Sequence, residues 1–167
     1  MANTYTLISS NTVGAGGVAS ITFSSIPSTY TDLLLVCSTR ITTTSGVVAS
    51  LKLQCNGVDI TGRRLGAEGN PMAAYSDTNA TAYTATDAAT ASTFNNTSFY
   101  IPNYGSTTTF KSVSIDSVTE NNAVSGGLDL VAGIYSANTA ITSLTILNAS
   151  FNLMQYSSAY LYGISKS

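Results

Sequence analysis

Apolar and polar residues alternate in short runs along most of the chain. Side chains of a β-strand point alternately to the two faces of its sheet, so apolar residues two positions apart predict a strand with one buried face. Helical periodicity is missing nearly everywhere. The aligned apolar positions include Leu51, Leu53, Cys55, Val113, Ile115, Leu144 and Ile146.

The alternation predicts nine strands bounded by Gly, Asn, Ser and Pro. Their expected ranges are 5–9, 19–23, 32–39, 47–55, 97–102, 110–119, 128–136, 141–148 and 159–164. Asn56 and Gly57 tolerate positive φ and predict a tight hairpin turn. Many short strands without a helix predict an all-β fold, an antiparallel β-sandwich and most simply a jelly roll of about eight or nine strands. An up-and-down barrel and other Greek-key sandwiches are the alternatives.

The segment 61–96 interrupts this pattern. It is rich in Ala, Thr and Gly and has no clean period. We therefore expect one domain over 1–167 with a long loop or insertion at about 61–96. Loops of this length are usually functional or pack on a neighbouring chain. The alternative is a weak hairpin or short helix folded onto its own domain.

Charge is scarce. Of the 167 residues, 8% are charged and 44% are hydrophobic, and the formal net charge is -2. A surface of hydroxyls and amides gives little colloidal repulsion, which favours a protein that lives in an assembly. Phosphate and membrane surfaces attract clustered Lys and Arg, whereas this chain has six, spread widely. We expect neither nucleic acid nor membrane as a partner.

Two further absences narrow the expected location and chemistry. No apolar run approaches bilayer length, and the start MANTYTLISS lacks the basic and apolar regions of a signal peptide, so we expect no secretion.

The chain has no His, which removes the usual general base and the commonest metal ligand. Cys37 and Cys55 lie in apolar runs and favour buried free thiols over a disulfide. We expect no cofactor and no metal.

The stretch FKSVSIDSVTENN concentrates charge and raises the question of a catalytic carboxylate pair. Asp116 and Glu120 are four residues apart, about 13 Å along an extended strand, which is wider than the carboxyl pairs of glycosidases. We place Val113 inward, Asp116 outward and Glu120 in the following turn. Lysines on strands are usually solvated, so we expect this of Lys52 and Lys111. No catalytic residue is predicted.

Arginine and tyrosine supply the remaining candidates. Adjacent Arg63 and Arg64 form the only charge doublet, and they either grip an acidic neighbour or lie in solvent. Tyrosine is enriched at protein contacts, and Tyr160 and Tyr162 share one strand face. The predicted intersubunit contacts are Arg63, Arg64, Tyr75, Tyr83, Tyr160 and Tyr162.

Several stretches together resemble a group of small virion structural proteins of tailed bacteriophages. They are YTLISSNTVGAGGVASITFSSIPSTYTDLLLV, YIPNY, FKSVSIDSVTENN, GLDLVAGIYSANTAITSLTIL and YLYGI. The resemblance covers both ends and the middle and fades over 61–96. These are strand and turn patterns, and they carry no catalytic residue.

This resemblance implies a non-enzymatic virion protein, for which we hold two hypotheses. The first is a decoration or cement protein on the capsid exterior, assembled in the host cytoplasm and partnered by the major capsid protein and by its own copies as a homotrimer. The second is a tail-fibre or receptor-binding module that recognises host surface carbohydrate.

Overall fold

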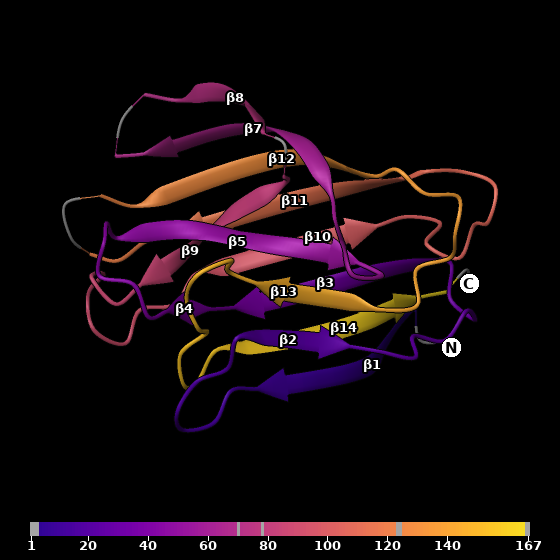
Figure 1. Cartoon of the computed structure of the whole chain (residues 1–167), viewed down its shortest axis with the longest axis horizontal. Coiled ribbons are helices and arrows are strands. Elements are labelled where there is room, and N and C mark those ends of the chain that lie inside the picture. The colour runs from indigo at the N-terminus through magenta and orange to yellow at the C-terminus, as the bar shows by residue number, and fades with distance from the viewer. Residues whose placement is uncertain (1–3, 70, 78, 123–124, 166–167) are drawn as a thin grey trace.

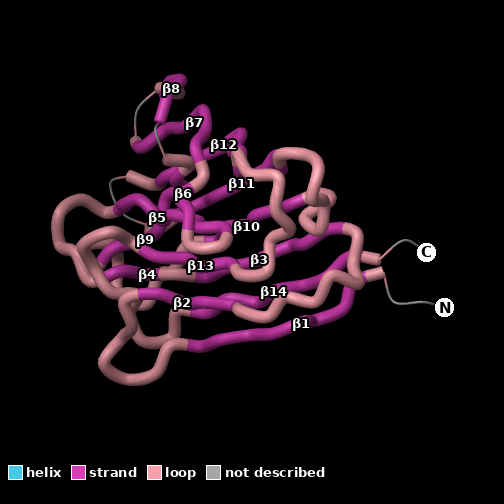
Figure 2. The backbone as a smooth tube through the Cα atoms, turned by 45° about the vertical axis from the view of Figure 1, so that its right-hand side comes forward, coloured by secondary structure: helices cyan, strands magenta, loops and turns pink. Residues whose placement is uncertain are grey.

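The computed structural model describes residues 4–69, 71–77, 79–122 and 125–165, which form 14 strands and no helix. The strands divide into two sheets in which nearly all neighbours are antiparallel. The sheets lie face to face in a sandwich-like arrangement (Figure 1). Loops and turns make up the rest of the described chain (Figure 2).

The larger sheet has eight strands. Their spatial order is β1 (Tyr5–Thr12), β14 (Ser158–Ile164), β3 (Asp32–Ser38), β10 (Asn96–Ile101), β11 (Lys111–Thr119), β12 (Gly127–Tyr135), β7 (Thr61–Glu68) and β8 (Ala73–Asp77).

The smaller sheet has six strands. Five follow one another in the order β2 (Ser20–Phe23), β13 (Leu144–Leu147), β5 (Val48–Cys55), β9 (Thr81–Thr86) and β4 (Arg40–Ile41), and the short β6 (Val58–Asp59) pairs with β5. The two sheets are separate, in contrast to the single closed sheet of an up-and-down barrel.

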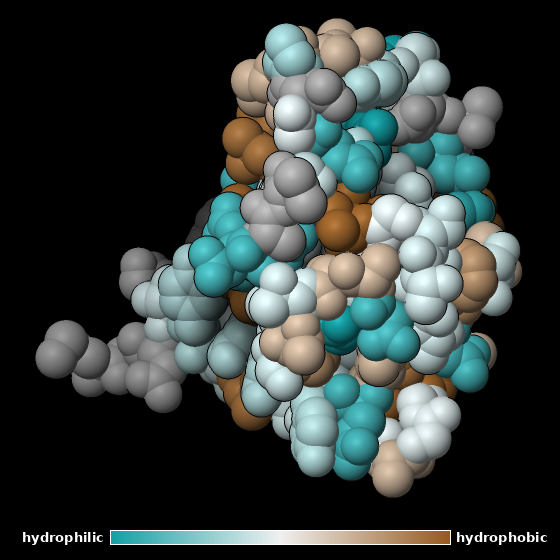
Figure 3. All heavy atoms as spheres, turned by 90° about the vertical axis from the view of Figure 1, so that its left-hand side faces the viewer, coloured by the Kyte–Doolittle hydropathy of each residue, from teal (hydrophilic) through white to brown (hydrophobic). Residues whose placement is uncertain are grey.

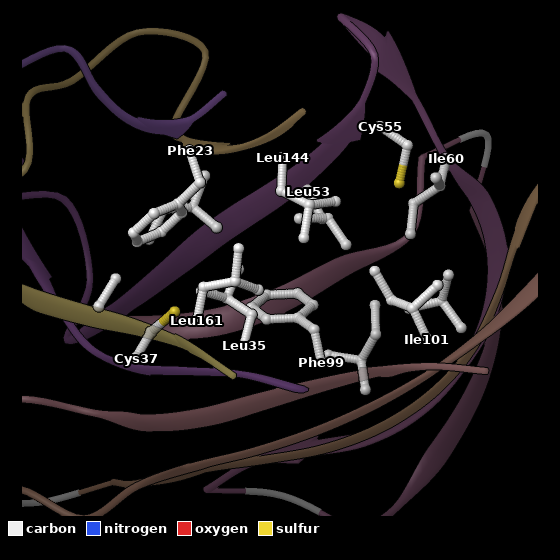
Figure 4. Packing of buried hydrophobic residues seen from close by; sticks show 14 of the residues in the cluster. Phe23, Leu35, Cys37, Leu53, Cys55, Ile60, Phe99, Ile101, Leu144 and Leu161 are labelled. Atoms are coloured by element: carbon white, nitrogen blue, oxygen red, sulfur yellow. The ribbon is translucent and has the colours of Figure 1, made fainter. Parts of the chain in front are cut away.

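The hydrophobic core fills the space between the sheets. Leu53 and Leu144 approach from the smaller sheet and meet Leu35, Phe99 and Leu161 from the larger one (Figure 4). All five are fully buried or within 1% of it. The alternation in the sequence is the direct cause, because each of these strands gives every second side chain to this layer.

Each of the nine strands expected from the sequence has a counterpart in the structure, but the described residues form 14 strands in total and not about eight or nine. The nine counterparts are β1, β2, β3, β5, β10, β11, β12, β13 and β14, with ends shifted by a few residues. The hairpin turn is also confirmed, since Asn56 and Gly57 have φ values of 51° and 77° between β5 and β6. The Asn56 side chain then holds a distant loop, because its Oδ1 accepts the backbone N–H groups of Thr142 and Ser143 at 2.9 and 3.1 Å.

The expected long loop at about 61–96 is instead mostly strand. β7 and β8 form a hairpin at one edge of the larger sheet, and β9 pairs with β5 in the smaller one. The alternative of a hairpin folded onto its own domain is therefore the better description of 61–77. Small residues on the buried positions, such as Gly62, Gly66 and Ala82, hide the alternation that normally announces a strand.

The expectation that Lys111 is solvated is wrong. Its side chain is 1% exposed, its Nζ donates to the backbone carbonyls of Ala137 and Thr139 at 3.2 and 2.6 Å, and it lies 5.8 Å from the centre of the Tyr135 ring. Lys111 is two residues before the inward-facing Val113, so the period of the strand itself places it inward. Lys52 is half-buried and pairs with Asp59 at 3.1 Å.

The first and last strands lie side by side. Tyr5 of β1 pairs with Ile164 of β14, and the backbone N–H of Ser165 donates to the carbonyl of Thr4 at 3.0 Å. Thr4 and Ser165 therefore lie together at one end of the sandwich, on the right in Figure 1.

Cys37 and Cys55 are buried free thiols, as the sequence predicted. They lie at opposite ends of the core cluster (Figure 4). Burial raises the pKa of the Cys55 thiol to about 12 despite the opposing charge of Lys111, and burial alone raises the pKa of Cys37 further. The reactive thiolate is therefore almost absent near neutral pH.

We expect the folded protein to resist thiol reagents. Incubation with a chromogenic disulfide reagent at pH 8 should release almost no colour, whereas addition of urea should release two equivalents per chain, because only unfolding brings both thiols into water. Fast reaction of one thiol in the native protein would contradict the burial of that residue. The assay needs only absorbance measurements.

Candidate interaction face

The larger sheet has an outer face that points away from the core. We call this the outer face; it consists of every second residue on the eight strands of that sheet. Sixteen large hydrophobic residues are exposed in the described part of the chain, and more than half of them lie here. They are Tyr5, Leu7, Leu65, Tyr100, Val118, Leu128, Leu130, Ile134 and Tyr160.

The densest part of the outer face is on β12 and its neighbours. Leu128 and Leu130 of β12 stand opposite Ala67 and Leu65 of β7, and Leu128 stands opposite Val118 of β11 on the other side. These are cross-strand neighbours, whose Cβ atoms lie about 5 Å apart, so the side chains form one continuous apolar patch.

On the same strands, glycines occupy several positions of the inner face. A Cβ atom on Gly127 would lie 2.9 Å from the Tyr83 ring, and one on Gly62 would lie 2.8 Å from the Cβ of Ala80. Gly133 is similarly close to Ile60, at 3.1 Å. The inner layer is thus too tight for a side chain at each of these glycines, whereas Leu128 and Leu130 of β12 point away from the core.

Few charges interrupt the outer face. Arg63 on β7 and Asp116 on β11 flank β12 on its two sides. Asp32 on β3 accepts a hydrogen bond from the hydroxyl of Tyr100 at 2.8 Å, and this bond raises the pKa of Tyr100. A shallow hollow of about 360 Å³ lies between β11 and β12, lined by residues that include Ser114 and Leu130.

The smaller sheet presents a polar surface in contrast. Thr22 and Thr145 share a hydrogen bond of 3.0 Å between their hydroxyls. Asp59 accepts bonds from Gln54 at 2.8 Å and from Lys52 at 3.1 Å, and these two donors, Gln54 first, lower the pKa of its carboxyl. The two broad faces of the molecule therefore differ in polarity. Only the outer face of the larger sheet is suited to bury apolar area in a contact.

Three of the six predicted intersubunit contacts lie on the outer face. Arg63 is exposed on β7, while Tyr160 and Tyr162 share the outer side of β14, as their spacing predicted. Tyr162 stands opposite Leu7 of β1. These residues are available to a partner, and their role as contacts stays a prediction.

The other three form a cluster within the chain. The guanidinium of Arg64 lies 4.5 Å from the centre of the Tyr75 ring and 4.8 Å from that of Tyr83, and its Nε lies 3.7 Å from a carboxylate oxygen of Asp129. Desolvation is the main cause that raises the pKa of Tyr83. Of the two alternatives for the arginine doublet, pairing with an acidic neighbour therefore applies to Arg64. Its acidic neighbour is Asp129 of the same chain.

The carboxylates of FKSVSIDSVTENN lie as the sequence predicted. Asp116 faces outward from β11, and Glu120 follows the strand, where its Oε1 accepts the backbone N–H of Asn122 at 2.6 Å. Among the described residues, no three His, Cys, Asp or Glu side chains are grouped so that they could hold a metal ion.

The sequence contained a signal for the outer face that alternation alone did not reveal. In GLDLVAGIY the leucines occupy one set of alternate positions and glycines begin and interrupt the other. Leu128 and Leu130 look like core residues by hydropathy, yet they face outward. Glycines on one face of a strand indicate that this face packs closely against its neighbours. The leucines on the opposite face are then expected to lie on the surface.

The described part of the chain has no helix that could cross a membrane. No protein-family model, no curated protein and no solved structure matches this chain.

Proposed function

We propose that this chain is a non-enzymatic virion structural protein, a decoration or cement subunit that binds the outside of a tailed-phage capsid. The observation that carries the proposal is the apolar outer face of the larger sheet. Monomeric proteins rarely expose a contiguous apolar surface of this kind, and where they do it usually marks a contact with another molecule.

The size of the outer face supports a stable contact. Eight strands spaced about 4.8 Å apart and roughly 25 Å long give a footprint of about 900 Å². A standard protein interface buries about 800 Å² on each partner. The outer face alone is therefore large enough to hold the subunit on a shell, while the polar smaller sheet faces solvent.

The strand order supports a jelly roll as the underlying fold. When the short strands β4 and β6 and the two inserted pairs β7–β8 and β11–β12 are set aside, eight strands remain. We count these eight strands in their order along the chain. The larger sheet then contains, side by side, the first, eighth, third and sixth strands, and the smaller sheet contains the second, seventh, fourth and fifth. Two interlocked Greek keys give this arrangement, and jelly rolls are common in viral capsid proteins.

The expected partners are the major capsid protein and further copies of this chain, as a homotrimer. Few charges and many hydroxyls on the surface suit a subunit held in a lattice, where repeated modest contacts combine into strong attachment. Arg63 and Asp116 flank the apolar patch and are placed to fix orientation by pairing with opposite charges.

The location is tested on purified particles that carry this chain. We expect quantitative mass spectrometry to find many copies, in a fixed ratio to the major capsid protein, and cryo-electron microscopy to place them on the shell with the larger sheet inward. Density for the chain at the tail tip alone would overturn the capsid location.

The docking face is tested by a charge placed within its apolar patch. Leu130→Asp should abolish co-sedimentation of added protein with particles stripped of it, because the side chain is 53% exposed in the free chain and becomes buried in the contact. The matched control is Val58→Asp, equally apolar and 56% exposed but on the β5–β6 hairpin, which should bind normally. Equal binding by both variants contradicts the role of the outer face.

A further inference from the structure

A second recess lies at the end of the sandwich opposite the chain ends, where two loops meet; Figure 3 views this end. One loop joins β9 to β10 and the other precedes β14. The recess has a volume of about 240 Å³. We call it the loop-end recess; its lining residues include Asp87, Ser92, Phe94, Gln155 and Tyr156.

Arg40 holds both walls of the loop-end recess in place. Its guanidinium donates to the backbone carbonyls of Thr90, Ala89 and Thr93 at 2.8, 3.0 and 3.0 Å, which fixes the first loop. Its own backbone carbonyl accepts the N–H of Met154 at 2.7 Å, which fixes the second. The side chain is almost fully buried, so the recess is already formed before any ligand arrives.

Two lining residues have backbones in the left-handed region. Ser92 has a φ of 64° and Tyr156 a φ of 72°. A residue with a bulky side chain rarely adopts this backbone conformation. Residues that do adopt it cluster at functional sites. The Tyr156 side chain is 68% exposed, the highest value among the large hydrophobic residues of the described chain. Packing in the core therefore gives no reason for a tyrosine at this strained position.

The side chains of the loop-end recess define the kind of ligand it fits. Tyr156 and Phe94 offer aromatic surface for an apolar ring face, while Asp87 and Gln155 supply groups that bond hydroxyls. The Asp87 carboxylate lies 3.4 Å from an Arg40 nitrogen, which compensates its charge. This leaves little attraction for a cation, and the carboxylate disfavours an anion.

We propose that the loop-end recess binds a neutral sugar, stacked on Tyr156 and bonded through its hydroxyls by Asp87 and Gln155. A compact ligand with one apolar face and several hydroxyls matches this combination of aromatic, carboxylate and amide groups. The inference goes beyond attachment to a shell and does not depend on it, since the recess and the outer face share none of these residues.

The test is a titration of the isotopically labelled full chain, followed by two-dimensional NMR. The probes are the methyl glycosides of glucose, galactose, mannose and N-acetylglucosamine, each tested separately. We expect saturable shifts of the backbone amides in 87–94 and 154–157 with at least one of them. Absence of such shifts with all four overturns the proposal.

Substitutions then assign the binding to the recess. Tyr156→Ala should weaken sugar affinity by about tenfold, the effect expected for loss of one aromatic stacking surface. Tyr5→Ala removes another exposed tyrosine, on β1, and should leave the affinity unchanged. Unchanged affinity in the Tyr156→Ala variant overturns the proposal.

The strained backbone provides an independent readout. Tyr156→Gly should raise the melting temperature, because glycine adopts positive φ without strain, and should weaken sugar binding as Tyr156→Ala does. Sugar binding retained by Tyr156→Gly contradicts the assigned role of the ring. Leu130→Asp serves as a separate control: it should bind sugar normally even though its attachment to particles is lost.

Discussion

Asp129→Ala is expected to lower the free energy of unfolding by about 3–5 kcal/mol, the cost of removing one partner from a buried ion pair. Asp129 is fully buried, and the side chain of Arg64 beside it is only 12% exposed. The substitution keeps the guanidinium between the rings of Tyr75 and Tyr83 but removes its buried carboxylate. Urea denaturation followed by fluorescence measures the change.

Two further variants make this result specific. Asp116→Ala removes an exposed carboxylate from the neighbouring strand β11, and it should change stability by less than about 0.5 kcal/mol. Combining Asp129→Ala with Arg64→Met should restore part of the loss, because no buried cation then remains. A double variant less stable than Asp129→Ala alone would contradict the pairing.

Arg40→Ala is expected to cost about 3 kcal/mol, because several backbone carbonyls lose a charged donor at once and a buried side chain leaves a void. Besides Thr90, Ala89 and Thr93, its guanidinium donates to the carbonyl of Asp87 at 3.3 Å. The loop between β9 and β10 depends on these bonds. Hydrogen exchange of its amides should accelerate in the variant.

Arg63→Ala is the matched control for Arg40. Arg63 is exposed, and its guanidinium donates to the carbonyl of the adjacent Gly62 at 3.1 Å. We expect its removal to change the unfolding free energy by less than about 0.5 kcal/mol. Equal destabilisation by the two substitutions would mean that the bonds of Arg40 contribute nothing beyond an ordinary surface arginine. Arg40→Lys should fall between them, since an ammonium has fewer donors.

Alternation was enough to find strands whose inner positions carry large apolar residues. Leu51, Leu53 and Cys55 on β5, and Val113 and Ile115 on β11, all lie in the core as their spacing predicted. The same rule placed Asp116 outward. Lys111 obeys the rule as well, and its solvation was wrongly expected because residue type was given more weight than position.

Alternation failed where buried positions carry small residues. β9 is buried at all six positions yet consists of Thr, Ala and a single Tyr, so hydropathy gives no period there. On β7 the inner positions include Gly62 and Gly66, while Leu65 faces outward. Such strands are identified by their partners in space, β5 and β12, which lie far away in the sequence.

The candidate sites were predictable to different degrees. The shared outer face of Tyr160 and Tyr162 was predictable, because residues two positions apart on a strand point to the same side. The apolar patch on β12 was not identified from alternation, because Leu128 and Leu130 have the hydropathy of core residues, and the glycines on the other face of the strand are the signal that was missed. The loop-end recess depends on Arg40, Asp87 and Tyr156, which are brought together by loops whose course depends on tertiary contacts.

The pairing of β1 with β14 makes the sandwich suitable for circular permutation. Thr4 and Ser165 are already joined by a backbone hydrogen bond, so a short linker between them would leave both strands in register. New ends opened at a solvent-exposed turn would then allow cargo to be displayed from a chosen side. Cargo fused next to Thr4 or Ser165 instead leaves the loop-end recess unobstructed, since these two residues lie at one end of the sandwich and the recess lies at the other.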